Sequence, residues 1–180
     1  GTRLNAMRLS GKVTEAPDSL AADMYDILTS ATARAGYRHY EISNFALPGH
    51  EAVHNSSYWN LTPYLGLGPG AHSFGGHDRS YNPSDLKGYI EASGIGFAIK
   101  ETETDAERFN DFIITSLRTT NGIDLERCRV LFGEDRQRLV SATAGQFVKS
   151  GIMWLADGKT GICEKHWLRS DSIMVEFIEV

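Results

Sequence analysis

The sequence predicts an α/β segment followed by a mainly helical, winged-helix-like domain, and three observations support this fold class. Residues 17–42 contain a helix-forming stretch that leads directly into an alternating strand, which is the order of elements in an α/β sheet. Three amphipathic stretches follow over residues 104–149, and a hairpin pattern follows them over 152–168. The pattern changes near residues 95–104, so we expect one domain at 1–95 and a second at 96–180.

The first predicted helix begins at Pro17-Asp18-Ser19 and ends at Gly36. Its apolar residues recur at helical spacing: Leu20, Met24, Ile27, Leu28 and Ala31. A strand is predicted for residues 37–42, with Tyr37, His39 and Glu41 on one side of it. One helix and one strand cannot close a sheet, so this region is predicted to be the end of a larger α/β domain.

Residues 43–82 are predicted to form a long loop, within which residues 64–67 are a candidate short strand. The loop contains six glycines, Gly49, Gly66, Gly68, Gly70, Gly75 and Gly76. Loops of this length are uncommon in compact domains unless they are functional, and their glycines indicate special backbone geometry or close approach to a ligand. A short helix is then predicted from Pro83-Ser84-Asp85 to Ser93-Gly94.

The last third is predicted to contain three helices, a hairpin and a final helix. The first helix begins at Thr104, which forms a capping-box pattern with Glu107, and ends at Asn121-Gly122. The second covers 124–132, and the third covers 134–149 with four inward apolar residues, Leu139, Val140, Phe147 and Val148. The hairpin has strands at 152–156 and 162–168 around a turn at 157–161, and the final helix covers 170–177.

Composition and charge exclude several classes of function. The net charge of -5 argues against general affinity for nucleic acid, and the mixed charges at 134–138 disfavour groove reading by the third helix. No apolar run approaches the ~20 residues that span a bilayer, and the first residues have no signal-peptide pattern, so we expect a cytoplasmic protein. Cys128 and Cys163 lie 35 positions apart without a CxxC partner, so we expect buried thiols rather than a disulfide or a metal site.

The stretch His54-Asn55-Ser56-Ser57-Tyr58-Trp59 is the most informative part of the chain. A histidine can ligate a metal, and aromatic side chains can stack on a flat ring system. The stretch therefore predicts a site for a planar, metal-bearing ligand, with His50 as an alternative ligand nearby. The competing interpretation is structural, in which Tyr58 and Trp59 anchor the long loop while His54 and Asn55 hydrogen-bond its backbone.

Three ordered motifs resemble one family. They are Tyr40-Glu41-Ile42-Ser43-Asn44-Phe45-Ala46, His54-Asn55-x-x-Tyr58-Trp59, and Tyr64-Leu65-Gly66-Leu67-Gly68-x-Gly70-Ala71-His72. In this order they resemble the radical S-adenosyl-L-methionine (SAM) proteins related to oxygen-independent coproporphyrinogen III oxidase. The match is closest to the HemW-type branch, whose members are proposed heme chaperones. The later segment 117–123 also fits that family's C-terminal domain.

The resemblance implies that residues 1–95 are the C-terminal end of a partial (β/α) radical SAM barrel with a long functional loop. Residues 96–180 would be the family's winged-helix-like C-terminal domain. Heme, SAM and a 4Fe–4S cluster would be cofactors of the whole protein. Its partners would be heme or a porphyrin, the missing N-terminal half of the barrel and heme-accepting proteins. Because the family's CxxxCxxC cluster motif is absent, we expect a C-terminal piece that binds none of these cofactors completely and is inactive alone.

The resemblance also points to candidate site residues, none of them catalytic. The heme-binding candidates are His54, Asn55, Tyr58 and Trp59, with His54 as the ligand of the heme iron. The SAM-pocket candidates lie at a strand end, where barrel enzymes carry their sites: Glu41, Ser43, Asn44, Phe45 and Ala46. The alternative for Glu41 is a solvated carboxylate or one paired with Arg34 or Arg38.

Two further groups of residues were weighed on their chemistry. The glycine-rich loop, Gly66, Gly68, Gly70 and His72, lacks the Gly-Lys-Ser/Thr of a phosphate loop, so close backbone packing is expected, with His72 in a polar network. Arg79 and Arg118 are candidates to meet either porphyrin propionates or carboxylates of this chain. Heme binding and delivery is the favoured function. The alternatives are oxidative decarboxylation of coproporphyrinogen III and a non-catalytic structural or interaction module.

Overall fold

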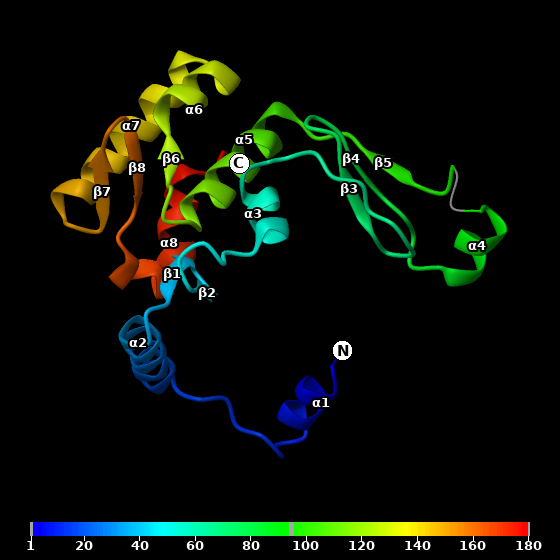
Figure 1. The fold of residues 1–180 in the computed structure, drawn as a ribbon, viewed down its shortest axis with the longest axis horizontal. Coiled ribbons are helices and arrows are strands. Elements are labelled where there is room, and N and C mark those ends of the chain that lie inside the picture. Colours follow the sequence, from blue (N-terminus) through cyan, green and yellow to red (C-terminus); the bar gives the residue numbers. More distant parts are fainter. Residues whose placement is uncertain (1, 94–95, 180) are drawn as a thin grey trace.

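The computed structural model describes residues 2–93 and 96–179 (Figure 1). Its N-terminal part contains helices α1 (Arg3–Leu9) and α2 (Asp18–Arg34) and strands β1 (Arg38–Glu41) and β2 (Asn44–Ala46). Helix α1 lies apart from the rest of the chain, at the end of an extended connection (Figure 1). The predicted first helix and the strand after it are confirmed as α2 and β1.

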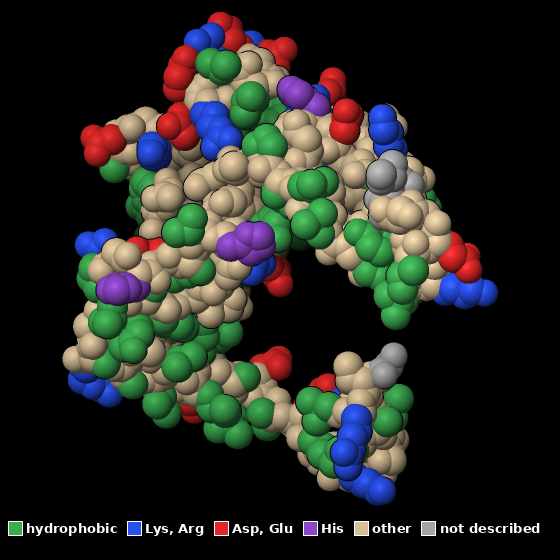
Figure 2. All heavy atoms as spheres, turned by 45° about the vertical axis from the view of Figure 1, so that its right-hand side comes forward, with side chains coloured by type: hydrophobic (Ala, Val, Ile, Leu, Met, Phe, Trp, Pro, Cys, Tyr) green, Lys and Arg blue, Asp and Glu red, His purple; other side chains and the backbone are tan. Residues whose placement is uncertain are grey.

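The apolar residues of α2 are not covered by the described part of the chain. Leu20, Met24, Ile27 and Leu28 are 47% to 68% exposed, although their spacing predicts an inward face. Figure 2 shows apolar side chains gathered along the lower edge of the molecule, where α2 lies. Helical spacing identifies an amphipathic helix, but it does not identify the surface that covers it.

Strand β1 pairs with β2 in an antiparallel hairpin, with Arg38 opposite Ala46. Its other edge meets the segment after α5, where Ile42 N donates to Arg118 O at 3.1 Å and Thr120 N donates to Tyr40 O at 3.2 Å. Every strand pair among residues 2–93 and 96–179 is antiparallel, and these residues close no barrel. The predicted mixture of helix and sheet is confirmed, whereas its place in a barrel stays a prediction.

The prediction of a structureless loop at 43–82 is wrong. The segment contains β2, α3 (Val53–Trp59), β3 (His72–Phe74) and β4 (Arg79–Tyr81). These elements are three to seven residues long, which is too short to show a period in the sequence. The candidate strand at 64–67 is reduced to one bridge, between Tyr64 and Phe74.

The middle of the chain forms an arm on one side of the molecule, with α4 (Leu86–Glu91) at its tip (Figure 1). Helix α4 confirms the helix predicted after residue 83, and Asp85 Oδ1 caps it by accepting from Gly88 N at 3.1 Å. Gly94, where we expected the end of this helix, lies outside the described residues. Strand β5 (Ile99–Glu101) pairs with β4, so the sheet β3-β4-β5 has strands on both sides of the domain boundary predicted at residue 95. The boundary itself stays a prediction.

The C-terminal part confirms the predicted order of elements. It comprises α5 (Asp105–Leu117), β6 (Ile123–Asp124), α6 (Leu125–Phe132), α7 (Glu134–Lys149), β7 (Met153–Ala156), β8 (Lys159–Ile162), the 3-10 helix η1 (Glu164–Arg169), α8 (Ser170–Met174) and the 3-10 turn η2 (Val175–Phe177). The capping box of Thr104 and Glu107 is present. The strands form a sheet of order β6-β8-β7. This order of helices and hairpin suits a winged-helix-like domain, which stays a prediction.

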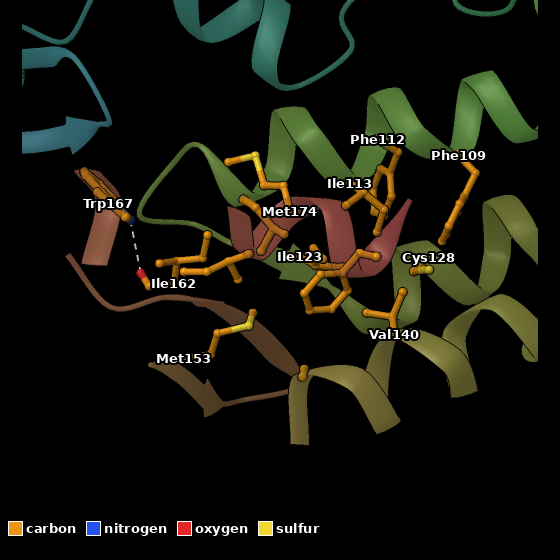
Figure 3. Close-up of a cluster of buried hydrophobic side chains, with 14 residues drawn as sticks. Phe109, Phe112, Ile113, Ile123, Cys128, Val140, Met153, Ile162, Trp167 and Met174 are labelled. Carbon is orange, nitrogen blue, oxygen red and sulfur yellow. Dashed lines mark hydrogen bonds between the residues drawn. The ribbon is translucent and has the colours of Figure 1, made fainter. Parts of the chain in front are cut away.

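The predicted second hairpin strand, 162–168, and the predicted turn, 157–161, are wrong, because the strand is Lys159–Ile162 and the turn is limited to residues 157–158. Residues 164–169 turn into η1, and this turn carries Trp167 into the core, where its Nε1 donates to Ile162 O at 3.1 Å (Figure 3). The chain leaves the sheet after Ile162 because burying the Trp167 indole with a satisfied N–H outweighs continued strand pairing.

One core joins the C-terminal elements (Figure 3). Its buried side chains include Phe109, Phe112, Ile113, Leu117, Ile123, Cys128, Val140, Met153, Ile162, Trp167 and Met174. The inward prediction for α7 is confirmed for Val140, which is 1% exposed, and wrong for Leu139, which is 51% exposed. The two are adjacent, about 100° apart around the helix, and the core covers only the side on which Val140 lies.

Candidate functional site

Glu41 ends β1 with a fully buried carboxylate. Its Oε1 accepts from Arg118 Nε at 3.0 Å and Nη2 at 2.7 Å. Its Oε2 accepts from Ser43 N at 3.0 Å, from Ser43 Oγ at 3.1 Å and from Asn44 Nδ2. The prediction that Glu41 is solvated or paired with Arg34 or Arg38 is therefore wrong, because its partner comes from the distant end of α5.

These hydrogen bonds decide the charge of Glu41. Burial raises the pKa of the carboxyl, but hydrogen bonds from Asn44, Ser43 and Arg118 outweigh burial and hold the pKa below its ordinary value. The carboxylate is thus ionised and fully occupied by donors of this chain. Its structural role is to fix the turn that carries Ser43 and Asn44.

The structure brings the five SAM-pocket candidates together in the β1–β2 hairpin. Ser43 is exposed, Asn44 is half-buried, and both side chains are held by Glu41. Phe45 stacks on the ring of His39, with centroids 4.2 Å apart and planes 12° apart, and Ala46 is buried. Ser43 and Asn44 are therefore the members of this group that remain accessible, and a SAM-binding role for them stays a prediction.

His39 is a buried polar residue of this hairpin that the sequence did not single out. Its Nδ1 lies 3.1 Å from Glu164 Oε1, and its Nε2 lies 2.9 Å from Ile42 O. The edge of its ring meets Trp167 at 4.5 Å between centroids. It therefore joins β1 to η1 across 125 positions of the sequence.

Tyr25 of α2 attaches the helix to the same hairpin by donating its hydroxyl to Ile42 O at 3.2 Å. Burial raises the pKa of this phenol to about 12, and the charges of Glu164 and Glu41 add to the effect. The phenol is therefore a permanent donor at neutral pH.

The His54–Trp59 stretch forms helix α3, so its side chains point in different directions. His54 and Tyr58, four residues apart, lie on one side, and Tyr58 Oη is 2.8 Å from His54 Nε2. The edge of Tyr58 meets Tyr64, with centroids 4.6 Å apart. His54 is exposed, and the side chain of Tyr58 is 38% exposed. This side therefore offers an accessible imidazole held by a row of aromatic rings.

Trp59 lies on a different side of α3, about 140° around the helix from His54. Its ring meets Tyr40 of β1 at 5.8 Å between centroids, and Tyr40 Oη accepts from Ala52 N at 3.2 Å, at the start of α3. Asn55, four residues before Trp59, shares this side and is half-buried. The structure thus separates the heme-binding candidates into two pairs. Trp59 and Tyr40 anchor α3 to the hairpin, as the structural interpretation expects.

A cavity of about 650 Å³ opens beside Trp59, between α2, β1, α3 and the loop after α5. Its lining residues are Thr29, Thr32, Ala33, Tyr37, Arg38, His39, Tyr40, Glu51, Ser56, Trp59, Asn60, Thr119, Thr120, Asn121 and Glu164. This volume lies in the range of small-molecule sites. Of the four heme-binding candidates only Trp59 lines it. Tyr37 and Arg38 contribute an aromatic wall and a cation that no sequence motif indicated, because the residues come from five separate segments, including Glu164 of η1.

The glycine-rich loop is tightly packed, as predicted. A Cβ on Gly66 would lie 2.1 Å from His72 O, so only glycine allows this approach to β3. Gly68 and Gly70 have φ of 103° and 72°, in the region that favours glycine. Asn82 Nδ2 donates to Gly68 O at 2.9 Å. His72 is exposed and stacks on Tyr81 at 5.6 Å between centroids, and it makes no side-chain hydrogen bond with the described residues.

Both candidate propionate partners are engaged within the chain. Arg118 pairs with Glu41, and Arg79 pairs with Glu103 and Asp111. The ion-pair interpretation is therefore confirmed for both arginines. Cys128 is buried as predicted, and Cys163 is half-buried.

Comparison with known proteins gives consistent similarity. The chain is 28% identical to heme chaperone HemW of Bacillus subtilis over 171 residues, which cover 93% of this chain and 45% of that protein. It is 30% identical to heme chaperone HemW of Mycobacterium tuberculosis, covering 80% of this chain and 37% of that one. It is 33% identical to the mitochondrial radical S-adenosyl methionine domain-containing protein 1 of Bos taurus, covering 68% and 30%. The chain thus spans less than half the length of these relatives.

A solved structure shares the fold. The coproporphyrinogen III oxidase HemN of Escherichia coli superposes with a TM-score of 0.60 at 22% identity, covering 85% of this chain and 40% of that one. At this identity the likeness shows the fold alone. No family model matches the chain. Among the described residues, no helix is long and apolar enough to cross a membrane.

Proposed function

We propose that this chain is the C-terminal part of a HemW-type radical SAM heme chaperone, and that helix α3 carries its heme contact. The relatives named heme chaperone support the ligand class. The exposed imidazole of His54 is the single observation that supports α3 as the place where heme is bound.

The residues on this side of α3 fit a heme. Heme iron takes an imidazole nitrogen as an axial ligand. The hydroxyl of Tyr58 holds the His54 ring at Nε2, and a group that fixes the second nitrogen of a ligating histidine typically strengthens the ligand. Leu65 and Leu67, which follow Tyr64 and are 77% and 78% exposed, offer apolar surface near this row of rings. A heme bound to His54 would rest on this surface. It would not contact Trp59, which lies on a different side of α3.

The donor set of this chain does not fit an iron–sulfur cluster. Such clusters are held by several cysteine thiolates, and the chain has two cysteines. Burial raises the pKa of the Cys128 thiol to about 11, which opposes the thiolate form. No group of three or more potential metal-ligating side chains occurs within the described ranges. The cluster of a radical SAM relative would therefore need residues beyond these, and we assign no catalytic step to this chain.

In this proposal Ser43 and Asn44 would lie beside SAM in the whole protein, and the partner of the heme-loaded chain would be a protein that accepts heme. The likeness of fold to coproporphyrinogen III oxidase supports a second candidate, in which the flat ligand is a porphyrinogen substrate and not heme. Conversion of coproporphyrinogen III by the full-length protein, reconstituted with its cluster, would favour that candidate.

Hemin titration of the chain tests the proposal. We expect a saturable shift of the Soret band in the unaltered chain and its loss in His54→Ala. Trp59→Ala and His50→Ala are matched controls, and both variants should retain the shift. Trp59 lies on a different side of α3 from His54, and His50 precedes the helix. An unchanged Soret band in His54→Ala would overturn the assignment of the ligand. Loss in His50→Ala alone would transfer it to His50.

A further inference from the structure

A second cavity, of about 190 Å³, lies between the β3-β4 part of the arm, α5 and α6. Its walls include four apolar side chains, Leu61, Phe74, Leu131 and Phe132. Three arginines, Arg79, Arg108 and Arg127, share the lining with two carboxylates, Glu103 and Asp111, and with Gly76 and His77. None of these residues belongs to the proposed heme or SAM sites.

The two carboxylates of the cavity, Glu103 and Asp111, share one arginine. Arg79 pairs with both Glu103 and Asp111, and its guanidinium lies 5.1 Å above the ring of Phe74. Burial lowers the pKa of Arg79, but Asp111 and Glu103 more than offset this effect, so its charge is fixed. The group keeps a net charge of −1, and Arg79 occupies both of its carboxylates.

Arg127 is the cation that the cavity leaves available. Its Nη2 donates to the carbonyl oxygen of Asn60 at 2.9 Å, and its Cζ lies 5.8 Å from the centre of the Phe112 ring. It forms no ion pair with a carboxylate of residues 2–93 or 96–179. A guanidinium has five N–H donors, so most of them remain free for a ligand.

Arg108 lies on the same rim and is paired with a carboxylate. It pairs with Asp105 at 3.2 Å, a residue whose side chain is 80% exposed, and its Nη2 lies 2.8 Å from His77 Nδ1. Asp105 compensates Arg108, so the positive charge in excess of the ion pairs at this cavity is that of Arg127 alone. Apolar walls with such an excess suit a ligand that has an apolar body and one anionic group.

We propose that this cavity binds a carboxylate attached to a small apolar group, with Arg127 as the charge partner and Leu61, Phe74 and Leu131 around the apolar group. The volume is below the roughly 300 to 1,000 Å³ of sites for drug-sized ligands, so the ligand is much smaller than a porphyrin. The site is therefore separate from the proposed heme contact. A free acid and the C-terminal residue of a peptide share this chemistry.

Titration of the isotopically labelled chain with phenylacetate, followed by NMR, tests the proposal. Phenylacetamide is the neutral control, and a blocked dipeptide with C-terminal phenylalanine, as its acid and as its amide, tests the peptide source. We expect saturable shifts at Leu61, Phe74 and Leu131 with an acid, and binding about tenfold weaker with the matching amide. Shifts with the dipeptide acid alone would support the peptide source.

Two pairs of variants sharpen this test. Arg127→Gln should weaken binding of the acid about tenfold, whereas Arg138→Gln, at an exposed arginine of α7, should leave it unchanged. Leu131→Trp should fill the cavity and abolish binding, whereas Leu139→Trp, at another exposed leucine, should not. Acids and amides that bind equally, acids that produce no shifts at the cavity, or full affinity in Arg127→Gln would each overturn the proposal.

Discussion

The guanidinium of Arg118 donates two hydrogen bonds to one oxygen of the buried Glu41 carboxylate, across 77 positions of the sequence. Backbone hydrogen bonds of Ile42 with Arg118 and of Thr120 with Tyr40 flank this pair. The β1–β2 hairpin is thus attached to the C-terminal part largely by polar contacts. Glu41 holds the side chains of Ser43 and Asn44, and Arg118 holds Glu41. Arg118 lies in the second of the two domains that the sequence predicts.

Arg118→Ala should lower the free energy of unfolding by about 3 kcal/mol. The change leaves a buried carboxylate without its charge partner, and we expect the lower end of the range for buried pairs because Arg118 itself is partly exposed. Urea unfolding measures the loss. Arg138→Ala, which removes an exposed pair, should change the free energy by less than about 0.5 kcal/mol. Equal stability of the two variants would show that the Glu41 pair contributes nothing.

The same pair predicts a dependence of stability on pH. The folded-state pKa of Glu41 lies below the ordinary value of 4.5, so its stabilising contribution is present above that value and is lost as the pH falls through the folded pKa. The difference in unfolding free energy between the unaltered chain and Glu41→Gln should therefore shrink from about pH 6 to about pH 3. Unfolding by urea across this range measures it, and a difference that stays constant would contradict the assignment.

The two cysteines should differ sharply in reactivity. Cys128 is fully buried, and burial raises the pKa of its thiol to about 11, so roughly one thiol in a thousand is ionised at pH 8. A thiol-specific disulfide reagent should therefore modify Cys163 quickly and Cys128 only at the rate of unfolding. Cys163→Ser should remove the fast phase, and Cys128→Ser should retain it. A fast phase that survives in Cys163→Ser would refute the buried position of Cys128.

The long amphipathic helices of the fold were predictable, because their periods and caps are local. Thr104, with Glu107 as its capping partner, marks the start of α5 five to thirteen residues before the core side chains of that helix, and the structure keeps that start. The choice between Leu139 and Val140 was not predictable, since both fit a helical stripe and only the position of the neighbouring elements decides which one is buried. The short elements between residues 43 and 82 were not predicted for a different reason, because segments of three to seven residues show no clear period.

The site was predictable in its residue types and not in its arrangement. The sequence places His54, Tyr58 and Trp59 together, but helix α3 turns Trp59 away from the other two. The carboxylate partners of Arg79 and Arg118 are 24 to 77 positions away, so no local motif reveals them. The cavity beside Trp59 is assembled from five segments, so no local pattern identifies Arg38 as one of its residues.

The glycines of the loop and of α7 should respond to alanine in opposite ways. A Cβ on Gly66 would collide with His72 O, so Gly66→Ala should cost about 2 kcal/mol or more. Gly145 lies inside α7 with no atom within 4 Å of a new Cβ, so Gly145→Ala should stabilise the chain by about 1 kcal/mol through helix propensity. Thermal unfolding should show a rise of about 2 to 4 °C for Gly145→Ala and a larger fall for Gly66→Ala. If Gly66→Ala has the same melting temperature as the unaltered chain, the glycine-rich loop does not pack on β3 and is free to approach a ligand instead.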